Sequence, residues 1–237
     1  MAIKRREQLM WTVGIETSAR DGSVALLQDQ ETIAERSLSQ EGRRHARTLV
    51  HELHSMLNEA GIAPRDCDLI AVSQGPGSFT GLRVGVVCAK TWAYATGCQL
   101  VGVDTLLAIA SSAALETGSV HVVADAQRGD LFHGVYQIAE SGEMKATSDV
   151  RVVSGDDWIR ELTAGSVVAG PATGQLKERL PTGVETLPAS TWFPTAVSVA
   201  KAGRNQASAN PTADPWTLNP IYLRKSAAEE KAGLTNQ

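Results

Sequence analysis

Hydrophobic residues near the start of the chain come in three short runs that polar turns separate. The runs cover residues 11–15, 23–27 and 32–38, and the turns between them carry Asp, Gly and Gln. Short runs of apolar and β-branched residues joined by tight polar turns are typical of strands. This part of the sequence therefore predicts an antiparallel meander of three strands.

The pattern then changes to helices that alternate with short strands. Between residues 46 and 60, apolar side chains recur at spacings of three and four, which is the period of an amphipathic helix, and Gly61 and Pro64 end it. The same criteria predict a strand at 69–72, a helix at 78–96, a strand at 100–103 and a helix at 105–115. A meander followed by such units predicts a mixed sheet with helices packed against it.

The second half of the chain begins again with strands, predicted at 121–124, 131–138 and 150–153. Further elements follow, namely a helix at 155–162, a strand at 166–169 and a helix at 195–206. Two halves that share one plan predict an α/β protein with two lobes. We expect an N-terminal lobe over 1–112, a C-terminal lobe over 113–218, and a tail over 219–237 that returns to the first lobe before it frays.

Composition narrows the classes of function. The net charge is −4 and only 5% of the residues are aromatic, which argues against tight binding of nucleic acid by charge or by base stacking. The three cysteines, Cys67, Cys88 and Cys98, are too few for a disulfide framework and predict a reduced, cytoplasmic location. The start of the chain lacks a small-residue cleavage site, so we interpret it as a first strand rather than a signal peptide.

A glycine-rich segment at 75–83 follows a predicted strand and opens a predicted helix. This context suits anion binding by the amide groups of a helix N-terminus. The glycine spacing matches neither a Walker A loop nor the dinucleotide fingerprint, and no Lys-Ser or Lys-Thr pair follows. A ligand loop and a tight turn that lets the helix pack closely both remain open interpretations.

The helix after this segment is apolar or neutral on nearly all sides. One ridge has small residues at every fourth position: Gly77, Gly81, Gly85, Ala89 and Ala93. A second face is apolar or neutral and consists of Val84, Val87, Cys88, Thr91 and Ala95. Glycine inside a helix costs about 1 kcal/mol relative to alanine, so the ridge needs a packing reason. We expect cover from the helix's own sheet on one side, and from the 45–60 helix or a partner subunit on another.

The sequence offers weak candidates for catalysis. His45, His51 and His54 are spaced by six and three rather than four, and no nearby Cys or acid completes a site, so we predict no catalytic metal. Glu16, at the end of the first strand, stands where actin-like and Hsp70-like ATPases place an acid facing phosphate and Mg²⁺. The weak candidate nucleotide residues are therefore Glu16, Thr17, Ser18, Gly75, Gly77 and Ser78. No convincing phosphate loop occurs in the second half, so we expect little or no ATP hydrolysis.

Several segments in this order resemble the bacterial TsaB family, also called YeaZ, over nearly the whole chain. They are IETS at 15–18, GSVAL at 22–26, His45 opening a helix, GPGSFTGLRVG at 75–85, GVDTL at 102–106, DAQRG at 125–129 and YLR at 222–224. The glycine-rich block is the most specific of them. The chain departs from the family in Glu16, where Asp is common, and in the residues before Trp11.

The resemblance implies the two-lobed ASKHA fold, which is RNase H-like, and a relation to TsaD. It implies a role in making N6-threonylcarbamoyladenosine at position 37 of tRNAs that read ANN codons. In this family TsaD is the catalytic subunit with the metal-binding histidines, TsaB is a non-catalytic platform, and TsaE is an ATPase that joins them. The implied partners are TsaD directly, TsaE in the complex, and tRNA only through the complex, with no tightly bound cofactor and ATP only at the level of the complex.

We therefore predict that the two N-terminal-lobe helices bind TsaD, and that a homodimer uses the same surface when TsaD is absent. The residues predicted for this surface are His45, Leu49, Leu53, Gly81, Val84, Gly85, Val87, Cys88 and Thr91. The alternatives are a stand-alone ASKHA phosphotransferase or ATPase, a metallopeptidase of the M22 type, and a homodimeric paralogue that does not contact TsaD.

Overall fold

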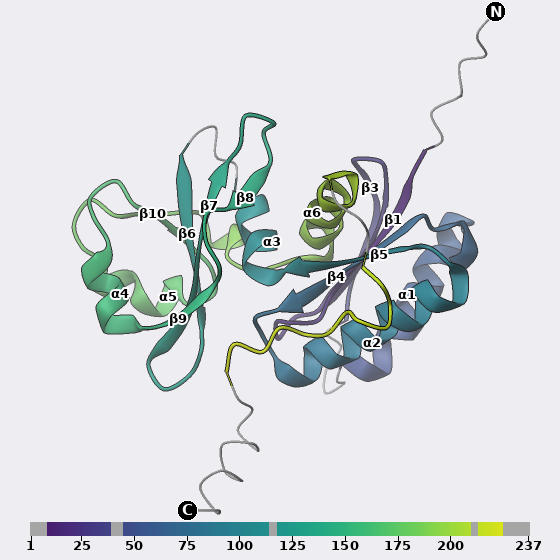
Figure 1. Cartoon of the computed structure of the whole chain (residues 1–237), viewed down its shortest axis with the longest axis horizontal. Helices are drawn as coiled ribbons and strands as arrows, with labels where there is room; N and C mark the ends of the chain where they lie inside the picture. Colours follow the sequence, from purple (N-terminus) through teal and green to yellow (C-terminus); the bar gives the residue numbers. More distant parts are fainter. Residues whose placement is uncertain (1–8, 39–44, 114–117, 210–212, 225–237) are drawn as a thin grey trace, which may run out of the picture.

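The computed structural model describes residues 9–38, 45–113, 118–209 and 213–224, with the side chains of 45–47 left out. Two mixed β-sheets lie next to each other, each with helices against it, and Figure 1 shows the two lobes that they form. The predicted two-lobed α/β architecture is confirmed. No helix within the described ranges is both long and apolar enough to cross a membrane.

The first sheet has the strand order β3-β2-β1-β4-β5. Its strands are β1 Trp11–Glu16, β2 Ser23–Gln28, β3 Glu31–Ser37, β4 Leu69–Gly75 and β5 Gln99–Asp104. β1, β2 and β3 pair antiparallel, as the meander predicts, while β4 pairs parallel with both β1 and β5. β1 is therefore the central strand, and its C-terminal end lies beside the end of β4.

Helices cover both faces of this sheet. α1 His45–Ala60 and α2 Phe79–Thr96 lie on one face, and α6 Ala196–Ala209 lies on the other (Figure 1). Alternation along the strands explains both layers, because Val13 and Ile15 pack with α1 and α2 while Ala25 and Leu27 pack with α6. α6 comes from the sequence range predicted for the second lobe but packs on the first.

The second sheet has the order β11-β10-β6-β7-β8, and β9 also pairs with β7. Its strands are β6 Ser119–Asp125, β7 Asp130–Ile138, β8 Met144–Ala146, β9 Arg151–Ser154, β10 Val167–Ala169 and β11 Glu185–Thr186. The short helices of this half are α4 Gly155–Glu161, α5 Thr173–Leu176, η2 Lys177–Arg179 and η3 Ala189–Thr191. In the first half, the short helix η1 Pro64–Asp66 precedes β4. β8 and β11 were not predicted, because two or three residues are too few to show a period.

The lobes meet at α3 Thr105–Ser111, which follows β5 directly. The helix was predicted to reach residue 115 but ends at Ser111, and 114–117 lie outside the described residues. The buried hydroxyl of Tyr136 on β7 donates a hydrogen bond to Oδ2 of Asp104 at 2.6 Å, which ties the two sheets together. The lobe boundaries at 112 and 218 stay a prediction.

The last described residues form a strap over the first lobe, which we define as residues 213–224. The strap starts beside β5, where the amide of Ala213 donates to the carbonyl of Leu100 at 2.8 Å. It passes β4, where the amide of Ile221 donates to the carbonyl of Gln74 at 2.8 Å. It ends at Arg224, whose guanidinium donates to the carbonyl of Ala126 in the second lobe at 2.6 Å.

Candidate functional site

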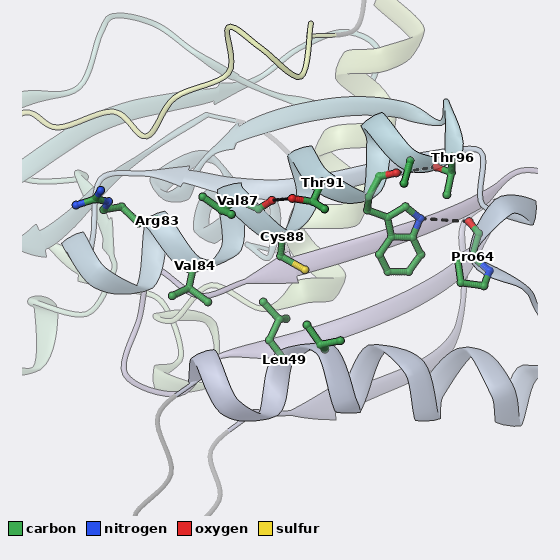
Figure 2. Close-up of a pocket in the computed structure, with 11 residues that line it drawn as sticks. Leu49, Pro64, Arg83, Val84, Val87, Cys88, Thr91 and Thr96 are labelled. Atoms are coloured by element: carbon green, nitrogen blue, oxygen red, sulfur yellow. Dashed lines mark hydrogen bonds between the residues drawn. The ribbon is translucent and has the colours of Figure 1, made fainter.

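An apolar groove of about 700 Å³ lies between α1 and α2. Figure 2 shows the side chains of both helices pointing into it. It is lined by Leu49, Val50, Pro64, Arg83, Val84, Val87, Cys88, Thr91, Trp92, Ala95 and Thr96. Five of these, Leu49, Val84, Val87, Cys88 and Thr91, belong to the surface that the sequence predicts for partner binding.

The groove exposes large apolar side chains to water. Val50 on α1 is 67% exposed and Val87 on α2 is 61% exposed, whereas Leu49 is buried and forms part of the floor. Arg83 is the only charged residue among those that line the groove. A contiguous apolar surface of this kind on a folded protein marks a site of interaction rather than a solvated face.

Local hydrogen bonds hold the groove wall in place. The hydroxyls of Thr91 and Thr96 donate to the carbonyls of Val87 and Trp92, at 2.8 Å and 3.0 Å, so these polar atoms are satisfied within α2. The indole Nε1 of Trp92 donates to the carbonyl of Pro64 at 3.2 Å and closes one end of the groove (Figure 2). Burial raises the pKa of the Cys88 thiol to about 11, so Cys88 contributes a neutral, weakly polar surface at pH 7.

The glycine ridge of α2 does not face the groove, and this part of the sequence prediction is wrong. A Cβ on Gly81 would lie 1.9 Å from the carbonyl oxygen of Thr17, and one on Gly85 would lie 2.3 Å from its Oγ1. The Thr17 hydroxyl also donates to the carbonyl of Gly81 at 2.8 Å. The glycines therefore let α2 approach the end of its own strand β1, not a partner.

Leu53 and His45 on α1 were also predicted to bind a partner. Leu53 is 2% exposed and packs in the core beneath α1, so it supports the helix and does not form its surface. The side chain of His45 lies outside the described residues. Sequence reasoning missed Val50, Pro64, Trp92 and the end of α2, although the exposed apolar positions of these helices carry a usable signal.

Glu16 at the end of β1 is completely buried. Its Oε1 accepts hydrogen bonds from the amide and the hydroxyl of Ser18, both at 2.5 Å, and from the amide of Ala19 at 3.1 Å. Burial raises the pKa of this carboxyl, and the hydrogen bonds from Ser18 and Ser73 partly oppose that shift. Glu16 therefore folds back onto its own turn.

The structure brings the weak nucleotide candidates together but packs them against each other. The amide of Ser78 donates to the carbonyl of Ser18 at 2.8 Å, and a Cβ on Gly77 would lie 2.7 Å from atoms of Ser18. The hydroxyl of Ser78 caps α2 by accepting from the amide of Gly81 at 3.3 Å. Two amides at this helix N-terminus, those of Ser78 and Gly81, thus have intramolecular acceptors.

Two of the histidines of α1 have described side chains. His51 and His54 are both exposed, and Nδ1 of His54 lies 3.2 Å from the side-chain amide of Asn58 on the same helix. Within the part of the chain that the structure describes, no group of three or more His, Cys, Asp or Glu side chains gathers as a metal site. The close pair is His121 and His133, 3.1 Å apart across β6 and β7, and burial lowers the pKa of His133 to about 4.

Comparisons with known proteins identify the family. The family model for TsaD, tRNA N6-adenosine threonylcarbamoyltransferase, matches residues 31–153. The "tRNA threonylcarbamoyladenosine biosynthesis protein TsaB" of Bacillus subtilis is 29% identical over 228 residues, covering 94% of this chain and 97% of that protein. The Escherichia coli protein of the same name is 32% identical over 135 residues, covering 56% of this chain and 58% of its own.

Solved structures agree with the sequence comparisons. YeaZ from Pseudomonas aeruginosa superimposes with a TM-score of 0.77 at 26% identity, covering 91% of this chain and 100% of that one. The similarity thus extends over both lobes. This chain belongs to the TsaB (YeaZ) family, within the wider family that the TsaD model describes.

Proposed function

We propose that this chain is a non-catalytic subunit required for threonylcarbamoylation of adenosine 37 in tRNAs that read ANN codons, and that its α1–α2 groove binds a TsaD-type catalytic subunit. The observation that carries the proposal is the groove itself. A member of the TsaB family exposes Val50 and Val87 on two adjacent helices, where a partner would shield them from water. TsaB relatives are named for this biosynthetic pathway.

The geometry of the strand ends supports a platform rather than an enzyme. An ASKHA phosphotransferase needs an acid directed at Mg²⁺ and free amides for phosphate. Here the Glu16 carboxylate accepts from its own turn, and the Ser78 amide donates to Ser18. We accordingly assign ATP, the ATPase TsaE and tRNA to the assembled complex in the cytoplasm, and the chemistry to the TsaD-type subunit.

A charge placed in the groove tests this proposal. Val87→Arg should weaken binding of the purified TsaD-type protein from the same organism about 100-fold or more, because burying an unpaired charge costs about 3 kcal/mol or more. The affinity is measured by titration calorimetry. Threonylcarbamoyladenosine in tRNA, measured by mass spectrometry in cells that carry only the variant, should fall in parallel. Since Val87 is 61% exposed, the isolated variant should keep the wild-type circular dichroism and melting temperature.

Val152→Arg is the matched control. Val152 lies on β9 in the second lobe and is 39% exposed, so the same substitution adds the same charge far from the groove. We expect it to bind and to modify tRNA like the wild type. If Val87→Arg binds the TsaD-type protein with wild-type affinity, the interface lies elsewhere. Val87→Arg should also dissociate a homodimer of the isolated chain, and sedimentation measures this change.

A further inference from the structure

The strap runs antiparallel along α2, on the side of the helix away from α1 (Figure 1). Three contacts of side chains on α2 define its path. The ring of Phe79 stacks on Tyr222 with centroids 4.4 Å apart, and the ammonium group of Lys90 donates to the carbonyl of Leu218 at 2.9 Å. At the far end, Tyr94 meets Trp216 edge to face at 5.2 Å.

Tyr94 and Trp216 form an aromatic pair that faces water. Their exposed fractions are 67% and 72%, the largest among the strongly exposed aromatic residues of the described chain. Aromatic side chains bury large apolar areas at a low cost in conformational entropy, which makes them frequent anchors of protein interfaces. Two such rings side by side on an otherwise well-packed lobe need an explanation.

The turn that carries Trp216 is held on several sides. Oδ1 of Asp214 accepts from the amide of Trp216 at 2.9 Å, and the carbonyl of Asp214 accepts from the amide of Leu218 at 3.1 Å. The side chain of Leu218 is only 6% exposed and belongs to the main core of the first lobe. The indole is thus presented by a braced turn, and little ordering remains for a partner to impose.

The pair and the groove share one surface of α2. Val87, Thr91 and Tyr94 are exposed at helical spacings of four and three, and together they form the crest of the helix. The groove lies on the α1 side of this crest, and the strap lies on the other side. A partner that sits over Val87 and Thr91 therefore reaches Tyr94 one turn further on, and Trp216 beside it.

The size of the groove favours such an extension. It is lined by 11 residues, whereas a stable protein–protein interface uses about 20–30 residues from each side. The groove alone is too small for a standard interface. Additional area has to come from exposed residues next to it, and the aromatic pair offers the largest apolar side chains along the crest.

We infer that the partner bound in the groove straddles α2 and covers the Tyr94–Trp216 pair, so that the strap is part of the interface. This inference rests on the proposed function and names a second half of the same binding surface. The occupant is the TsaD-type protein. The alternative of an RNA base on the pair is less favoured, because the rings meet edge to face rather than as a parallel slot, and Asp214 lies in the same turn.

Alanine substitutions of the pair test the inference. Trp216→Ala and Tyr94→Ala should each weaken binding of the TsaD-type protein at least about 10-fold, as buried aromatic anchors do. The two losses should be less than additive in the double variant, because each ring packs on the other. Phe193→Ala is the matched control, since Phe193 is 53% exposed and lies just before α6, the helix on the opposite face of the sheet from α2. It should bind like the wild type.

The outcomes separate this inference from the proposed function. If Val87→Arg abolishes binding while both alanine variants bind with wild-type affinity, the groove is correct and the strap lies outside the interface. If the wild-type chain does not bind the TsaD-type protein, the proposed function fails first. If the alanine variants lose affinity for isolated tRNA in a filter-binding assay but not for the protein partner, the pair is an RNA platform and the inference is wrong. Melting temperatures within about 2–3 °C of the wild type show that the variants are folded.

Discussion

At the scale of single residues, Glu16 is the group whose role the structure redefines. A fully buried carboxyl at the end of a central strand normally directs attention to a ligand. Here its Oε1 collects the amides of Ser18 and Ala19 and shapes the turn that receives α2. The residue thus organises the turn that follows β1 and contacts the start of α2.

Glu16→Gln should raise the free energy of unfolding at neutral pH, because burial disfavours the ionised form of the Glu16 carboxyl and a neutral amide avoids that cost. The pKa of Glu16 is raised in the folded protein above its ordinary value of 4.5. The stability that the protonated Glu16 carboxyl contributes is therefore fully present below about pH 4.5. It is lost as the pH rises through the folded-state pKa of Glu16. Urea denaturation between pH 4.5 and 8 should show a flatter pH dependence for the variant than for the wild type.

The exposed Glu31 on β3 supplies the control, as Glu31→Gln removes a charge without touching the buried turn. It should leave the pH profile of stability close to that of the wild type. A less stable Glu16→Gln variant at pH 7 would instead mean that the charge itself is required by the amides of the turn.

At the scale of elements, the contact between α2 and β1 decides how the binding surface is oriented. Gly81 and Gly85 turn the small ridge inward against Thr17, so the larger side chains Val84, Val87 and Cys88 are left facing the groove or solvent. One helix thus uses its two apolar faces for different purposes. The inner face builds the lobe, and the outer face is available for a partner.

Gly81→Ala should destabilise the protein by about 1–3 kcal/mol, although alanine favours a helix by about 1 kcal/mol over glycine. The added Cβ would lie 1.9 Å from the Thr17 carbonyl oxygen, so the backbone of β1 or α2 has to move. Chemical denaturation measures the loss. Thr80→Ala, at the neighbouring exposed position of the same helix, should be neutral or slightly stabilising. A stable Gly81→Ala variant that no longer binds the TsaD-type protein would return the glycine ridge to the interface.

At the scale of the whole molecule, the two lobes are joined by the apolar packing of α3 against the second sheet and by hydrogen bonds. The Tyr136 hydroxyl reaches Asp104 at the start of α3, and Arg224 of the strap reaches the β6–β7 turn. Burial raises the pKa of Asp104, and the hydrogen bonds from Tyr136 and from the amides of α3 partly oppose this shift. The hydrogen bond between Tyr136 and Asp104, in the middle of the chain, and the strap, near its C-terminus, both link the two sheets.

Tyr136→Phe should cost about 1–3 kcal/mol, the usual range for leaving a buried polar group unsatisfied, because one oxygen of Asp104 loses its donor. Thermal unfolding measures the change, and amide exchange should increase in α3 and β7 more than in α1 and α2. Tyr94→Phe, which removes a hydroxyl from an exposed ring, should leave the melting temperature unchanged. Uniform exchange across both lobes in Tyr136→Phe would contradict a local role at the lobe junction.

The sequence by itself determined much of the architecture. The apolar periodicities located the meander, α1, α2, α6 and the main strands, because burial of regularly spaced side chains follows from the geometry of a helix or strand alone. They also indicated that α2 needs cover on more than one side. Five residues of the groove, Leu49, Val84, Val87, Cys88 and Thr91, were predicted from this pattern together with the family resemblance.

Only the tertiary structure decided which face of α2 does what. Both of its faces carry small or apolar residues at helical spacing, so local pattern cannot tell an inward ridge from an outward one. The choice depends on Thr17, which is 64 residues away in the sequence from Gly81. The meeting of Trp216 with Tyr94 and the approach of His121 to His133 likewise require a chain path and a strand register. Such contacts are set by the packing of distant segments, which periodicity does not encode.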